Sequence, residues 1–196
     1  RFPRGNLVYV GKTPSILQKV GLNGNLPMLT TATHIKKALE EKIQDDHTHG
    51  LTKDQIKALP EKIANPVMIM DSLNDGSNSI VIVTDMLDGD KNPVIIAVKA
   101  DSKGMYHNIE MNSNFILTYY GKDGFHNFID KNVRNNTFLF IDEKRSRILS
   151  NQAKVQFFGK LKSYDLDTII RKTKANVKPF VENEVYFTLV FGNHDH

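Results

Sequence analysis

Three short runs rich in Val and Ile constrain the fold of this chain more than any other feature of its sequence. They are PVMIMDS at 66–72, SIVIVTDM at 79–86 and PVIIAVKA at 93–100, and clusters of Asn, Asp, Gly and Pro separate them. β-Branched residues favour strands and such polar clusters favour turns. The Asp88-Gly89 step between the last two runs is typical of a hairpin. The sequence therefore predicts an antiparallel sheet.

Later runs extend this sheet. NFILTYYG at 114–121 and TFLFID at 137–142 have the composition of strands, and EVYFTLVFG at 184–192 alternates like a late strand. We therefore expect one α+β domain over residues 1–196, with helices packed on an antiparallel sheet.

Helical spacing of apolar residues predicts the helices. The first runs from Thr33, as N-cap, to about Ile43, and a second, short one follows the capping-box pair Thr52 and Gln55 and is broken at Pro60. Two more helices are predicted between and after the last strands, at 125–133 and 143–150.

Composition excludes several classes of protein. The chain has 196 residues, 40% of them hydrophobic and 24% charged, which suits a globular domain with a sizeable core. It has no Cys, so a disulfide framework, a thiolate zinc site and a cysteine nucleophile are ruled out. No apolar run approaches the roughly 18 residues of a membrane span. The start, RFPRGNLVYVG, has neither an initiator Met nor a signal-peptide core, so we expect a piece of a longer protein.

Basic residues are grouped along the chain. The net charge is +4, and Lys and Arg gather in HIKK at 34–37, DEKRSR at 142–147, GKLK at 159–162 and RKTKANVK at 171–178. Such groups can line a groove for phosphates, or they can be solvated faces of an averagely basic domain. Charge permits a polyanionic partner without requiring one.

Five segments together carry a resemblance to a known family. They are LPMLTTATHIKKAL, HGLTKDQIKALPEKIANPVMIMDS, IVIVTDMLDGDKNPVIIAVKA, IEMNSNFILTYYGKD and FLFIDEKRSRIL. In order and approximate spacing the chain resembles the MuF C-terminal domain of phage head-morphogenesis-like and polymorphic toxin proteins. The resemblance covers about residues 12–150, and residues 151–196 are a C-terminal extension that can add a strand. Family members commonly carry Ser where this chain has Thr118.

The resemblance implies a fold and a function. The family is similar to ribonucleases of the Barnase–EndoU–colicin–RelE class, in which N-terminal helices pack on an antiparallel sheet. It implies a toxin-type, metal-independent endoribonuclease that needs no cofactor, cleaves RNA, with tRNA as one possible substrate, and has a cognate immunity protein. Such a domain acts in the cytoplasm of a target cell after secretion or phage delivery. The alternative is a non-catalytic domain that binds nucleic acid or docks in a phage structure.

Metal-independent cleavage needs a group that takes the 2′ proton of the ribose, a group that protonates the leaving oxygen, and donors for the charge on phosphorus. Strand alternation places Thr118 and Tyr120 on one face, together with Asn114 and Ile116, while Phe115, Leu117 and Tyr119 form a core face. His34 lies at the edge of the apolar stripe of the first helix. The candidate catalytic residues are His34, Lys37, Thr118 and Tyr120. The candidate nucleic-acid-binding residues are Lys36, Lys122, Lys144 and Arg145.

Two segments contain possible metal ligands. DDHTHG at 45–50 offers Asp45, Asp46, His47 and His49, but it falls between two helices, where no strand aims the imidazoles. Asp85, Asp88 and Asp90 have the wrong spacing for a calcium loop, and hairpin chemistry accounts for the Asp-Gly step. We therefore expect no metal site.

Overall fold

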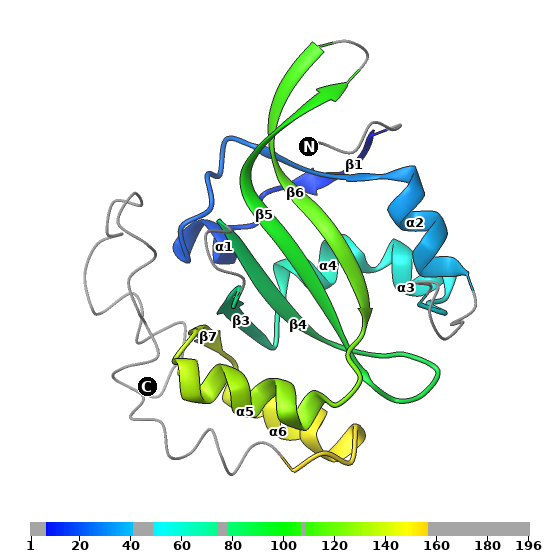
Figure 1. Cartoon of the computed structure of the whole chain (residues 1–196), viewed down its shortest axis with the longest axis vertical. Helices are drawn as coiled ribbons and strands as arrows, with labels where there is room; N and C mark the ends of the chain where they lie inside the picture. The colour runs from blue at the N-terminus through cyan, green and yellow to red at the C-terminus, as the bar shows by residue number, and fades with distance from the viewer. Residues whose placement is uncertain (1–6, 41–48, 74–77, 107–108, 157–196) are drawn as a thin grey trace, which may run out of the picture.

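The computed structural model describes residues 7–40, 49–73, 78–106 and 109–156, and these form a seven-stranded sheet with six helices. The strands are β1 (Leu7–Lys12), β2 (Pro27–Thr31), β3 (Met68–Asp71), β4 (Ser79–Leu87), β5 (Pro93–Tyr106), β6 (Ile109–Gly121) and β7 (Phe138–Ile141). They lie side by side in the order β1-β2-β6-β5-β4-β3-β7 (Figure 1). The prediction of a domain that combines helices with a sheet is confirmed.

The centre of the sheet is the antiparallel meander β4-β5-β6. All the strands predicted between residues 66 and 142 are present, and β5 and β6 run farther than predicted, so that their hairpin extends past the other strands in Figure 1. The predicted turn joins β4 to β5: the Asp88 carboxylate accepts hydrogen bonds from the backbone amides of Asp90 (2.9 Å) and Asn92 (2.8 Å). This is the local side-chain-to-backbone bonding that makes Asp a turn residue.

The sheet is mixed, which corrects the prediction of an antiparallel one. β2 runs parallel to β6, with Met28 opposite Asn114 and Leu29 opposite Phe115. The other neighbouring strands are antiparallel. Parallel neighbours need a long connection between them. A local pattern of apolar residues cannot indicate the direction of a strand relative to a partner so far away in sequence.

The helices are distributed along the chain, which corrects the expected N-terminal position. They are α1 (Ser15–Lys19), α2 (Ala32–Leu39), α3 (Lys53–Lys57), α4 (Leu59–Ala64), α5 (Phe125–Asn135) and α6 (Glu143–Gln152). Three elements that were not predicted, β1, α1 and β2, come before α2. Each of them has only five or six residues, too few for a periodic pattern to stand out.

The helix starts show which local signals were reliable. Thr52 and Gln55 form the predicted capping box at α3, and Pro60 lies in the first turn of α4. The N-cap of α2 is Thr31 instead of Thr33: its backbone is still extended as part of β2, and its hydroxyl accepts a hydrogen bond from the amide of His34. The helix ends at Leu39, and the predicted end at Ile43 lies outside the described residues.

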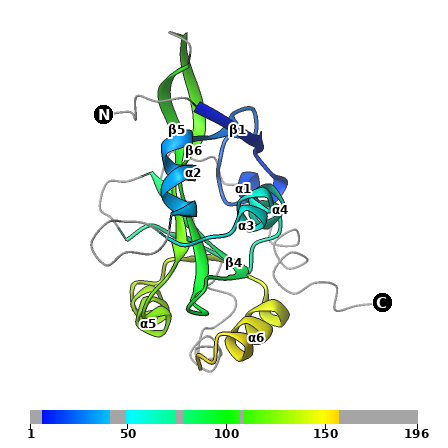
Figure 2. The same ribbon diagram turned by 90° about the vertical axis from the view of Figure 1, so that its right-hand side faces the viewer.

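Two apolar clusters pack on opposite sides of the sheet. The first contains Leu17 of α1, Ile63 of α4 and the sheet residues Ile82, Ile96 and Ile116. The second contains Ile129 of α5 and Leu149 of α6, together with the sheet residues Met70, Val83 and Ile95. Figure 2 shows α5 on one side of the sheet and α1, α3 and α4 on the other. Helix α2 lies beside β6, and its Ala38 enters the first cluster. The stretch of β5 and β6 between α2 and α5 is where the candidate residues gather.

A buried polar network ties the first residues of the domain to β6. The amide nitrogen of Asn114, which is fully buried, donates hydrogen bonds to the Thr13 hydroxyl (2.8 Å) and the Asn23 carbonyl (2.9 Å). Its oxygen accepts from the backbone amide of Asp101. Asn114 was predicted to share the Thr118 face, but its bonds make it structural.

Candidate functional site

A β-bulge decides which side chains of β6 face α2 and α5. Ala97 pairs with Thr118, but the next residue of β5, Val98, pairs with Ile116, so Leu117 is an extra residue on β6. Such a bulge shifts the alternation of side chains beyond it. Ile116 and Tyr119 both enter the first cluster. Thr118 and Tyr120 lie on the opposite face.

Because of this bulge, the residues that share a face with Thr118 differ from those predicted by simple alternation. Tyr120 pairs with Ile95 of the second cluster, while Phe115 pairs with Lys99, so Phe115 and Tyr120 share a face with Thr118. Ile116 does not, although simple alternation placed it there. Leu117, predicted to be in the core, is 37% exposed. We call the surface formed by Phe115, Thr118 and Tyr120 the β6 face.

His34 lies at one end of the β6 face. It is the third residue of α2, and its imidazole meets the Phe115 ring edge-on, with the ring centroids 6.0 Å apart. Burial lowers the pKa of His34, the nearby Ile116 carbonyl opposes this effect and the positive charge of Lys37 adds to it. Within the described residues the buried Nδ1 atom has no hydrogen-bond partner. His34 therefore presents a neutral imidazole near pH 7.

His49 lies toward the other end of the β6 face. Its imidazole stacks on the Tyr120 ring, with centroids 5.1 Å apart and planes inclined by 29°. Its backbone amide donates to the Lys37 carbonyl (3.2 Å), so the residue is fixed to the end of α2. The sequence predicted no role for His49, because nothing local indicated that residues after α2 return to β6.

Tyr120 and Lys122 form the lower part of the site with α5. The Lys122 ammonium lies 6.0 Å from the centroid of the Tyr120 ring and 5.7 Å from that of Phe128 on α5, within the range of cation–π attraction. Burial raises the pKa of the Tyr120 hydroxyl, and the negative charge of Asp123 raises it further. Tyr120 is therefore protonated near pH 7 and can donate a hydrogen bond.

The turn after β6 is held by close packing. A Cβ atom on Gly121 would overlap the Asp88 side chain, so Gly is required there. The Lys122 amide donates to the Pro93 carbonyl (2.9 Å), and the Asn92 side chain bridges to Asp123 (2.9 Å). These contacts hold Lys122 beside Tyr120.

The remaining basic candidates are divided between two places. Lys36 and Lys37 are exposed on α2, and Lys36 pairs with Glu40 at 3.6 Å. Lys144 and Arg145 belong to α6, and the β6 face does not include them. Arg145 binds the Asp85 carboxylate at 2.9 Å and the carbonyls of two residues before β3, Asn65 and Pro66.

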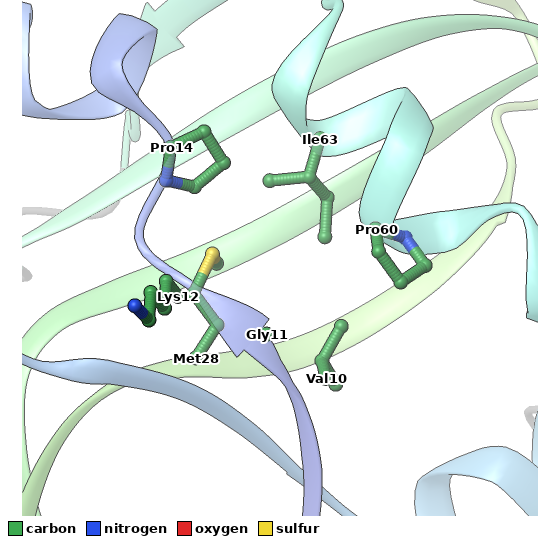
Figure 3. Close-up of a pocket in the computed structure, with 7 residues that line it drawn as sticks. All are labelled: Val10, Gly11, Lys12, Pro14, Met28, Pro60 and Ile63. Atoms are coloured by element: carbon green, nitrogen blue, oxygen red, sulfur yellow. The ribbon is translucent and has the colours of Figure 1, made fainter.

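Neither the described side chains nor the described cavity suggests a second site. No group of three His, Asp or Glu residues in the described ranges is placed to hold a metal ion, and Asp45, Asp46 and His47 lie outside those ranges. Asp85 is bound by Lys62 and Arg145. A cavity of about 20 Å³ beside β1 is lined mainly by apolar side chains such as Met28 and Ile63 (Figure 3). It is large enough for roughly one water molecule.

Three aromatic neighbours of the site could not be found from sequence. Phe115 was assigned to the core, Phe128 fell within the helix predicted at 125–133, and His49 was placed between two helices. The bulge at Leu117 and the return of the chain after α2 bring them to the candidate residues. No short-range pattern carries that information.

Comparison with known families places the chain. The model of the phage MuF C-terminal domain matches residues 40–148, more than half of the chain. The chain therefore belongs to the phage MuF C-terminal domain family. The matched range includes β6 and His49, whereas His34 lies before it. No curated protein and no solved structure matches the chain. In the described residues no helix is long and apolar enough to cross a membrane.

Proposed function

We propose that this chain is a toxin-type endoribonuclease domain that cleaves RNA without a metal ion. The observation that carries the proposal is the set of groups that gathers at the β6 face. The face itself supplies the hydroxyl groups of Thr118 and Tyr120. The neutral imidazole of His34 contacts it at Phe115, and Lys122 lies beside Tyr120. These are the group types that acid–base cleavage of a phosphodiester requires.

The proposed reaction is attack of a ribose 2′-hydroxyl on the adjacent phosphodiester. His34 accepts the 2′ proton through a ring nitrogen as the 2′-oxygen forms a bond to phosphorus. The bond from phosphorus to the 5′-oxygen breaks, and that oxygen takes up a proton. The products are a 2′,3′-cyclic phosphate and a 5′-hydroxyl. No metal or redox cofactor takes part in the proposed steps.

The other residues stabilise charge and hold the substrate. Thr118 donates a hydrogen bond to a phosphoryl oxygen, and Lys37 and Lys122 offset the negative charge that develops on phosphorus. Tyr120 donates its hydroxyl to the phosphate or contacts a base. Lys36 attracts the RNA backbone from the exposed side of α2. Arg145 and Lys144 take a lesser part, since Arg145 is already engaged with Asp85.

The family supports the wider setting of this proposal. Membership of a phage family is consistent with delivery into a target cell, where we propose that the domain meets RNA in the cytoplasm and that a cognate immunity protein blocks its site. Membership of the Barnase–EndoU–colicin–RelE class and tRNA as the substrate belong to the same proposal. The contacts of Lys122 with two aromatic rings also favour a second candidate, a domain that binds nucleic acid without cleaving it.

Incubation with RNA in EDTA separates these candidates. The purified chain is mixed with total RNA and excess EDTA, and the fragments are sized and their ends analysed. The proposal predicts discrete fragments with 2′,3′-cyclic phosphate ends. Intact RNA that nevertheless comigrates with the protein would favour the binding domain, and cleavage that requires added Mg²⁺ would overturn the proposed mechanism.

A further inference from the structure

Helix α2 holds two histidines at its opposite ends. His34 is in its first turn, where Thr31 caps the helix. His49 is bonded at the other end: the backbone amides of His49, Gly50 and Leu51 donate to the carbonyls of Lys37, Glu40 and Ala38 at 3.2, 2.8 and 2.7 Å. Residues 49–51 thereby satisfy carbonyls that the end of a helix leaves without partners. Backbone hydrogen bonds therefore hold His49 to the same helix that carries His34.

We infer that His49 is the general acid of the proposed ribonuclease and that it works opposite His34, which is the base. This inference rests on the proposed function. It adds a residue to which the sequence assigned no role, and it divides the two proton transfers between two named side chains.

The two histidines are associated with opposite ends of the α2 dipole. The amino end of a helix carries partial positive charge, and the carboxyl end carries partial negative charge. His34 lies at the positive end, and burial together with the charge of Lys37 lowers its pKa, so its neutral form is favoured. The backbone amide of His49 is bonded to the Lys37 carbonyl at the carboxyl end of α2, where the helix carries its partial negative charge. A neutral base and a protonated acid are the forms needed at the start of the reaction.

The neighbours of His49 are consistent with a cationic ring. The face of Tyr120, on which it stacks, attracts cations. Among the described groups on α2 and around Tyr120, Glu40 is paired with Lys36, Asp123 places a negative charge near Tyr120, and Lys37 and Lys122 are positive. Lys122 lies 6.0 Å from the same tyrosine ring and opposes a second positive charge there. A bound phosphate would offset this repulsion, because its negative charge lies between the cations.

The positions along β6 suit a substrate that lies between the histidines. His34 contacts Phe115, and His49 contacts Tyr120. Thr118 lies between these two residues on the same face. In the proposed arrangement a phosphate bound by Thr118 receives His34 from the Phe115 side at its 2′-hydroxyl and His49 from the Tyr120 side at its leaving 5′-oxygen. In the step itself the bond from phosphorus to that oxygen breaks, and its electron pair takes the proton from the His49 ring.

The test uses a substrate that needs no acid. His49→Phe keeps an aromatic ring for Tyr120 to stack on but cannot donate a proton, and His126→Phe on α5 is the matched control. Each variant is assayed on an RNA oligonucleotide and on a uridine 3′-(p-nitrophenyl phosphate), whose leaving group departs without protonation. We expect His49→Phe to lose about 10²- to 10⁴-fold on RNA and less than about 10-fold on the activated ester. His34→Ala should lose activity on both substrates, because both need the base.

Three results would overturn the inference while leaving the proposed function in place. These are wild-type RNA cleavage by His49→Phe, an equal loss on both substrates, and a selective rescue of His34→Ala by the activated ester. A wild-type chain that cleaves neither substrate would instead overturn the proposed function. Thermal melting of each variant distinguishes loss of a proton donor from loss of folding. If His49→Phe does not fold, His49→Gln replaces it, and the same three results would overturn the inference.

Discussion

Polar side chains meet in two parts of this molecule, and the two differ in whether oppositely charged side chains pair with one another. In the first, Asp85 of β4 binds Lys62 at 3.1 Å and Arg145 at 2.9 Å, so β4, α4 and α6 are joined. In the second, at the β6 face, the neighbouring His34 has a buried ring nitrogen without a hydrogen-bond partner among the described residues. Burial alone would raise the pKa of Asp85, but hydrogen bonds from Arg145 and Lys62 outweigh it and lower that pKa.

The difference indicates what each cluster does. Opposite charges that bind one another stabilise a fold and have little capacity left for a ligand. A buried polar atom without a partner costs stability, and a role in a reaction is one explanation for it. The Asp85 cluster is therefore expected to govern stability, and the β6 face to govern activity.

The largest expected effect is on His34. His34→Ala removes the proposed base, so RNA cleavage should fall by about 10²- to 10⁴-fold. The melting temperature should change little, since the His34 ring lies at the edge of the core. Cleavage rate and thermal melting are measured on the same preparations, with His126→Ala as the control. A His34→Ala protein with wild-type cleavage would show that the unpaired nitrogen has no part in catalysis.

The second largest loss of activity is expected on substitution of Thr118. Thr118→Ala removes one hydrogen-bond donor to the phosphate, which typically costs on the order of 3 kcal/mol at the transition state, or about 10²-fold in kcat. Thr118→Ser keeps the hydroxyl and should retain most of the activity. Equal loss in both variants would mean that the methyl group, and so packing on β6, is what matters.

Asp85 should affect stability instead of chemistry. Its side chain is partly exposed, so we expect Asp85→Asn to lower the free energy of unfolding by only about 1 kcal/mol, while RNA cleavage is unchanged. Because its folded-state pKa lies below the unfolded value of 3.8, the stabilisation is present above that pH and is lost as pH falls through the folded pKa. Urea unfolding from neutral to acid pH measures both. An Asp85→Asn protein that is fully stable but inactive would exchange the roles assigned to the two clusters.

The smallest expected effect is a difference in RNA binding between variants of two lysines, Lys122 and Lys144. Lys122→Ala should weaken RNA binding and reduce the salt dependence of binding by about one phosphate contact, because Lys122 lies over Tyr120. Lys144→Ala, on α6, should change binding less. Fluorescence anisotropy with a labelled oligonucleotide at several salt concentrations compares them. A larger loss in Lys144→Ala would move the nucleic-acid surface away from the β6 face.

Sequence reasoning succeeded where the signal was local. The Asp88-Gly89 turn, the Thr52–Gln55 capping box and the central strands depend on a few neighbouring residues, and the structure confirms them. The N-cap of α2 was misplaced by two residues, because the capping signal could not reveal that β2 continues to Thr31.

The missed features are long-range. The parallel pairing of β2 with β6 and the approach of His49 to Tyr120 join segments that are distant in sequence. One extra residue, Leu117, reversed the faces assigned to Ile116 and Phe115, since the alternation of a strand does not survive a bulge. The predicted strand at 184–192, like the basic groups beyond residue 156, lies outside the described residues.

The claim that the β6 face is the site is tested most directly by NMR spectroscopy of the histidine side chains. The imidazole resonances are assigned by single substitutions, and the protein is titrated with a 2′-deoxy oligonucleotide, which binds but lacks the attacking hydroxyl. The account predicts large shifts for His34 and His49 and a much smaller one for His126, which is paired with Asp130 on α5. Binding that shifts His126 but leaves His34 and His49 unmoved would contradict it.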